Sequence, residues 1–251
     1  MSKLPAWRLA RHAYLDVLGN ANGLVRIGGL WLVASWALVM LGRSFPLLAA
    51  AADVAIALGA AAVAVAWHRH IIDGEALAGR VAPVDARVLR YFVLTILIAL
   101  VVGVVPLGVV LLLAGGGDTA VGEGSAGLGL LLIPPVMLAC IYGAMRVQLV
   151  FPATAIGDQS VTLARSWAVT DGNGWRLVGG FFITALPVAL ALLALSYLLR
   201  ALAEATGSIV LTALADLVAV GNPWLQAPLI ASFLSYVYLF FRQRTELAPT
   251  Q

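Results

Sequence analysis

The chain has 251 residues, of which 62% are hydrophobic and only 11% are charged, and its mean hydropathy is +1.00. Soluble domains carry about 25% charged residues, so this composition leaves too few charges to cover a soluble fold. The net charge is +3, but the arginines lie at the ends of apolar runs, which indicates membrane topology and not nucleic acid as a partner. A single cysteine, Cys140, excludes a disulfide framework.

The N-terminal segment carries charges along its whole length, whereas a secretory signal peptide has an uninterrupted apolar core. Trp7, Ala10 and Tyr14 recur at helical spacing within this segment. The pattern predicts an amphipathic surface helix over about residues 5–19, which precedes the first membrane span.

Six apolar runs are long enough to cross a bilayer, whose core of about 30 Å takes about 20 helical residues. They cover about residues 24–41, 47–67, 89–113, 128–150, 177–199 and 223–241. Because lipid offers no partners to open backbone groups, the predicted fold class is all-α, a polytopic helical bundle in a single integral membrane domain over residues 1–251. A further apolar piece over 209–220 is too short to span alone. It lies at the interface or extends the sixth helix.

Basic residues are distributed unequally between the two sides of the predicted bundle. Of the 15 lysines and arginines, only Arg43 and Arg200 lie on the side opposite the N-terminus. The positive-inside rule therefore places both termini in the cytoplasm of a bacterium, with the chain in the inner membrane. The loop over 114–127 has two acids and no base, and is expected on the exported side.

Two similar phrases precede different spans: residues 22–29 read NGLVRIGG and residues 173–180 read NGWRLVGG. Each is preceded by an amphipathic segment, so the chain is interpreted as parallel repeats of a surface helix, a turn, an arginine and a span. The alternative is chance recurrence in a chain with 25 glycines.

The second amphipathic segment predicts a cytoplasmic helix over about residues 160–171. Ser160 is expected to cap its start and Gly172 to end it. A looser third copy of the unit is expected to begin its helix at Pro83, since proline suits the first helical position.

Four arginines mark the cytoplasmic ends of the predicted spans. They are Arg26, Arg90, Arg146 and Arg176. One interpretation is a basic ring that binds anionic lipid headgroups or a phosphorylated ligand. The other is that these side chains only determine topology by extending to the interface.

Asp53 is the acid that lies well inside an apolar run, and an ionisable group there is a candidate functional residue. The alternative is a structural ion pair with Arg43 or Arg200 in a polar pocket near the exported side. Asp216, in the short apolar piece, is interpreted as a residue of a polar helix face.

Residues 67–75 read WHRHIIDGE and form the densest polar cluster. On a helix His68 and His70 point in different directions, so only His70 and Asp73 share a face and are weak candidates for a metal site. The alternative is an interfacial anchor, with Trp67 at the level of the headgroups. No catalytic or cofactor-binding motif is recognisable, so no cofactor is expected and an enzyme is disfavoured.

Three segments together resemble a known group of membrane proteins: VAWHRHIIDGE (65–75), RVLRYFVL (87–94) and LVFPATAIGDQSVTLARSWAVTDGNGWRLVGG (149–180). The chain is similar over about residues 8–244 to bacterial YciC-like six-span inner-membrane proteins and to the membrane domain attached to some glycerophosphodiester phosphodiesterases. The resemblance implies location and topology. It implies no hydrolase activity, since a soluble phosphodiesterase domain is missing.

Three functions are hypotheses at this point. The first is a non-enzymatic protein that binds anionic lipid or organises envelope components, alone, as a homo-oligomer or with an envelope protein partner. The second is a transporter of ions or small molecules, based on Asp53 and the proline-containing spans. The third is an integral-membrane enzyme acting on lipid headgroups, with His68, His70 and Asp73 as its site.

Overall fold

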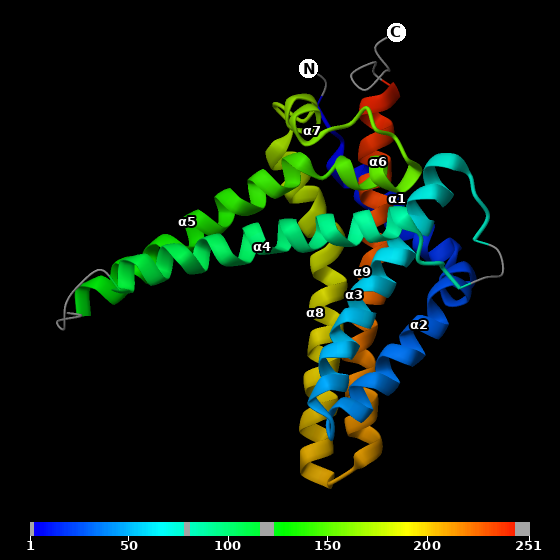
Figure 1. Ribbon diagram of the computed structural model, residues 1–251, viewed down its shortest axis with the longest axis vertical. Coiled ribbons are helices and arrows are strands. Elements are labelled where there is room, and N and C mark those ends of the chain that lie inside the picture. The colour runs from blue at the N-terminus through cyan, green and yellow to red at the C-terminus, as the bar shows by residue number, and fades with distance from the viewer. Residues whose placement is uncertain (1–2, 78–80, 116–122, 244–251) are drawn as a thin grey trace.

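The computed structural model describes residues 3–77, 81–115 and 123–243, and every regular element in these parts is a helix (Figure 1). In chain order the helices are α1 (Ala6–Gly19), α2 (Ala21–Gly42), α3 (Pro46–Asp73), α4 (Ala86–Gly115), α5 (Glu123–Val147), α6 (Val150–Ile156), α7 (Leu163–Val169), α8 (Gly174–Thr206) and α9 (Ile209–Gln243). Six of the described helices are long and apolar enough to cross a membrane. The predicted all-α polytopic fold is confirmed. Half of the predicted exported loop, residues 116–122, lies outside the described residues, and the rest belongs to the ends of α4 and α5.

Helices α2, α3, α8 and α9 form a long bundle, and α1, α6 and α7 gather at one end of it (Figure 1). Helix α1 lies there and α9 ends there, so we call it the terminal end, and we call the end with the α2–α3 and α8–α9 turns the opposite end. Helix α9 is the most buried candidate span, with 61% of its most apolar window inside the molecule. It contacts α1, α2, α3, α6 and α8, which makes it the centre of the bundle.

The α4–α5 hairpin leaves the bundle and runs crosswise to it (Figure 1). Only 6% of the most apolar window of α4 is buried, although that window has the highest hydropathy of the candidate spans, 2.8. An apolar helix surface without protein neighbours needs lipid as its solvent.

Several helix boundaries differ from the predicted ones, two of them because a neighbouring side chain caps the backbone. Helix α9 begins at Ile209, so the short apolar piece extends the sixth span. Helix α7 begins after Thr162, whose hydroxyl accepts the N–H of Arg165, so the cap is not Ser160. Helix α4 begins at Ala86 and not at Pro83, because the carboxylate of the preceding aspartate caps its first turn. Helix α7 ends at Val169 with Thr170 as its C-cap residue, so Gly172, with φ +67°, lies beyond the end of the helix and does not terminate it as predicted.

The two similar phrases occupy different structural positions. Asn173 is the N-cap residue of α8, whereas the corresponding Asn22 lies inside α2. Of the two adjacent glycines that end each phrase, the one that packs closely is Gly28 in the first phrase, against Val63 and Trp224, but Gly180, the second of its pair, in the second phrase. The asparagines and the paired glycines therefore do not mark equivalent turns or contacts. The surface helix before each span is the part of the predicted unit that the structure retains.

Candidate functional site

A pocket of about 660 Å³ lies at the terminal end, between the first turns of α4 and the turn that follows α6. Arg87 and Arg90 line it from α4, and Gly157 and Asp158 line it from the turn. Apolar side chains of the same α4 face, among them Val93, extend the lining. We call it the arginine pocket.

Asp85 fixes the start of α4 beside this pocket. Its Oδ1 accepts the backbone N–H groups of Arg87 and Val88, both at 2.9 Å, which satisfies two open donors of the first helical turn. Its Oδ2 accepts a hydrogen bond from Arg69 at 2.9 Å, and Arg69 also donates to the carbonyl of Ala155 in α6 at 3.0 Å. The two walls of the pocket are thereby tied to α3.

The charge of Asp85 gives this junction a pH dependence. Burial raises the pKa of the Asp85 carboxyl, but the hydrogen bonds from Val88, Arg69 and Arg87 outweigh it, so the pKa lies below its ordinary value of 3.8. A carboxyl with a lowered folded-state pKa stabilises the fold fully above the ordinary value. This stabilisation is lost as the pH falls below the ordinary value and through the folded-state pKa.

Replacing Asp85 by asparagine is expected to flatten the loss of thermal stability below about pH 4, since asparagine still caps the helix but has no charge to titrate. Thermal unfolding of the detergent-solubilised protein between pH 3 and 7 measures the slope. The matched control is Asp73→Asn, an exposed acid of α3, which should keep the wild-type slope. Equal slopes in wild type and Asp85→Asn would contradict the assignment.

The guanidinium of Arg87 lies against the turn after α6, at a position where the turn has a glycine. Gly157 has φ +80°, a left-handed conformation that favours glycine. A Cβ there would lie 3.2 Å from Nη2 of Arg87, so the arginine packs directly over the turn. Within the described residues, neither Arg87 nor Arg90 forms an ion pair with a carboxylate.

The carboxylate in the pocket, that of Asp158, already accepts hydrogen bonds from other groups. Asp158 accepts the N–H of Ser160 at 2.8 Å and the hydroxyl of Tyr238 at 2.5 Å. Burial raises the pKa of Asp158, but these hydrogen bonds and the charge of Arg242 bring it below its ordinary value. With two guanidiniums and one carboxylate the pocket carries one net positive charge. It therefore suits a ligand with a single negative charge.

The four predicted arginines do not form a ring of equivalent residues. Arg146 is buried: it stacks on Trp167, with Cζ 4.2 Å from the ring centroid, and donates to the Trp167 carbonyl and to Asp171. It therefore holds α7 against α5. Arg176 is exposed and donates to the carbonyl of Leu4.

Only Arg90 of the predicted set lines the arginine pocket, and Arg26 is exposed on α2. The second arginine of the pocket, Arg87, was not predicted as a site residue. Its spacing of three residues from Arg90 on one helix face is the signal that could have revealed it.

Asp53 is exposed on α3, and the described residues give it no ion pair. The predicted partners, Arg43 and Arg200, both bind Asp216 instead. The side chain of Asp216 is only 6% exposed, so its interpretation as a polar-face residue is wrong. The α8–α9 turn at Gly207 brings Arg200 and Asp216 side by side. A sequence prediction that α8 and α9 form one hairpin would have placed these two residues together.

The polar cluster of α3 separates into different environments. His68 is fully buried, with Nδ1 2.7 Å from the hydroxyl of Ser235 and Nε2 3.4 Å from that of Tyr91. His70 bonds the carbonyl of Glu75, and Asp73 is exposed. Across the described ranges, no three His, Cys, Asp or Glu residues are grouped closely enough to hold a metal ion.

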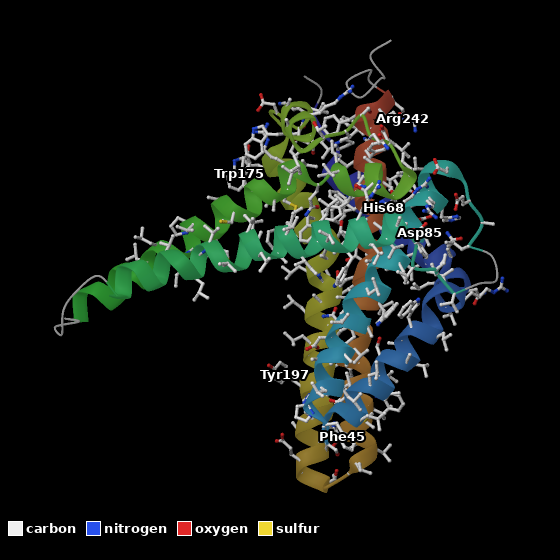
Figure 2. All side chains as sticks on the ribbon, in the orientation of Figure 1. Phe45, His68, Asp85, Trp175, Tyr197 and Arg242 are labelled. Carbon is white, nitrogen blue, oxygen red and sulfur yellow. The ribbon has the colours of Figure 1, made fainter. Side chains whose placement is uncertain are left out.

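Trp67 is buried inside the protein, whereas the anchor interpretation requires a side chain exposed to the headgroups. It is 0% exposed, and its Nε1 donates to the hydroxyl of Ser232 at 2.7 Å and to Asp16 of α1 at 3.2 Å. Figure 2 shows His68 and Asp85 toward the terminal end, whereas Phe45 lies toward the opposite end. The residues 67–75 thus connect α1, α3 and α9.

Comparison of the chain with protein-family models, with curated proteins and with solved structures found no match. Evidence for function therefore comes from the geometry of the arginine pocket and from the chemistry of its residues.

Proposed function

We propose that the chain is a non-enzymatic protein of the bacterial inner membrane that binds the phosphate of an anionic lipid in the arginine pocket. The observation that carries the proposal is the pair Arg87 and Arg90, which line a pocket without forming an ion pair in the described parts of the chain. Guanidinium groups bind phosphate oxygens through charge-assisted hydrogen bonds.

The apolar side of the pocket supports a lipid as the source of that phosphate. Val93 and Leu94 follow Arg90 on the same face of α4, one turn further from the start of the helix. A phosphate at the arginines would leave the acyl chains beside these residues. The strongly apolar exposed surface of α4 continues in the same direction.

The proposed orientation places the terminal end, and with it the arginine pocket, on the cytoplasmic side. Thirteen of the 15 basic residues support it by the positive-inside rule. The exceptions, Arg43 and Arg200, are held by Asp216. We also propose membership of the YciC-like group, on the sequence resemblance alone. The exposed position of Asp53 and the separation of the histidines lend no support to a transporter or an enzyme.

The double variant Arg87→Gln/Arg90→Gln is expected to weaken retention of anionic phospholipid about 30-fold, since each arginine near an anionic surface contributes about 1 kcal/mol. Native mass spectrometry of the full chain, with phosphatidylglycerol titrated into detergent, measures the retained lipid. Inorganic phosphate in a parallel titration distinguishes a lipid site from a site for free phosphate.

The chain offers a matched control in Arg8→Gln/Arg11→Gln. These arginines are exposed and lie three residues apart on α1. Replacing them removes the same amount of charge from the terminal end. Retention should stay within about twofold of wild type in this variant. Equal losses in the two double variants would show a nonspecific charge effect and would overturn the assigned site.

A further inference from the structure

A second pocket, of about 570 Å³, lies where the α4–α5 hairpin diverges from the bundle, and we call it the wedge pocket. Tyr91, Thr95 and Ile98 line it from α4, and none of the residues that line this pocket also lines the arginine pocket. Helices α3, α5, α6, α8 and α9 and the turn before α6 supply the other walls. The wedge pocket is thus separate from the arginine pocket, and a ligand bound in it is independent of the proposed function.

The walls of the wedge pocket carry no charged side chain among the described residues that line it. Helix α3 contributes a stripe of alanines, which leaves room for a ligand close to the backbone. Two hydroxyls in the lining are already engaged: Thr95 donates to the carbonyl of Tyr91 at 2.9 Å, and Tyr91 Oη lies 3.4 Å from His68. The polar groups that remain are two glutamine amides.

These two amides have unused hydrogen-bonding capacity. Gln148, in the turn after α5, is only 8% exposed, and its buried Oε1 has no partner among the residues that the structure describes. Gln226 of α9 donates through Nε2 to the carbonyl of Ala185 at 2.9 Å, while its Oε1 is also buried with no partner in the described parts of the chain. Buried polar atoms in proteins nearly always have a partner, so two unfilled acceptors around one apolar pocket need an explanation.

We propose that the wedge pocket binds a neutral long-chain lipid alcohol, whose hydroxyl donates to the amide oxygen of Gln148 or Gln226 while its chain lies along the alanines of α3. A phosphate or an ammonium would be buried there without an opposite charge, which is costly. A plain hydrocarbon would leave both amides unfilled. A hydroxyl supplies the missing donor without a charge.

Diacylglycerol and polyprenols share this chemistry, and the two sources are separated by experiment. The full chain in detergent is titrated with dioleoylglycerol, with a polyprenol, and with the methyl ether of dioleoylglycerol, which cannot donate. Native mass spectrometry measures retention of each. We expect at least one alcohol to be retained about three- to tenfold more tightly than the methyl ether, the range of one net hydrogen bond.

Variants of the pocket give an independent readout. Gln148→Leu and Gln226→Leu should each reduce the preference for the alcohol over its methyl ether, whereas Gln243→Leu, an exposed glutamine at the end of α9, should leave it unchanged. Ala60→Phe should fill the pocket and abolish retention of both ligands. Arg87→Gln/Arg90→Gln should leave alcohol binding intact, which separates this site from the arginine pocket.

The titrations of the wild-type protein test the proposal even where a variant fails to fold. Retention of one alcohol and not the other assigns the source, and retention of both assigns the class. Equal retention of the alcohol and its methyl ether, or retention of neither alcohol, overturns the proposal.

Discussion

Replacing Arg43 and Arg200 together by glutamine is expected to lower the free energy of unfolding by about 3–5 kcal/mol, the range found when a buried charge loses its partners. Both guanidiniums bind the carboxylate of Asp216, whose side chain is only 6% exposed. Without them a carboxylate remains at the opposite end of the bundle with no described cation beside it. Thermal unfolding in detergent, with helical circular dichroism as the signal, measures the loss.

The triad supplies its own controls. Each single variant, Arg43→Gln or Arg200→Gln, should lose much less, because the other arginine still neutralises the acid. Adding Asp216→Asn to the double variant should restore most of the stability, since the buried charge is then removed. If the double variant is no less stable than the single ones, the ion pairs do not stabilise the fold.

Gly180→Ala is expected to destabilise the protein by about 1–3 kcal/mol, the usual cost of overpacking a close contact. A Cβ at Gly180 would lie 2.5 Å from Cζ of Phe233 in α9 and 3.1 Å from Cβ of Ala6 in α1. Phe233 is fully buried, so its ring has little room to move. The added methyl group therefore pushes α8 away from both neighbours.

The preceding glycine is a matched control on the same helix. A Cβ at Gly179 would meet nothing within 4 Å, so Gly179→Ala should raise stability by up to about 1 kcal/mol through helix propensity alone. Thermal unfolding of the two variants side by side measures the difference. Combining Gly180→Ala with Phe233→Leu should recover part of the loss. Similar shifts for both alanine variants would contradict the contact.

The candidate site was only partly predictable from sequence. Arg90 was predicted as a site residue because it lies at the end of a span, which local sequence shows, and it does line a pocket. Arg146 has the same local pattern, yet it is buried against Trp167. The difference arises because α7 folds back onto the end of α5. No local property of either arginine reports that contact.

The acids show the same division. Hydropathy singles out Asp53, since its neighbours are apolar, but the structure exposes it and buries Asp216. The ion pair that decides this joins Arg43 and Asp216, which are 173 residues apart in the chain. A pairing over such a separation depends on how three helices pack, and the sequence around either residue does not contain it.

By itself the sequence determined that the chain is an all-α protein with six helices able to cross a membrane. Hydropathy and backbone hydrogen bonding act over about 20 consecutive residues, so they can be recognised in one segment at a time. Only the tertiary structure decided which polar groups are satisfied and which are left to bind a ligand. The groups left to bind a ligand are the guanidiniums of Arg87 and Arg90 and the amide oxygens of Gln148 and Gln226. They differ from arginines and glutamines that have a protein partner because of the helices packed beside them.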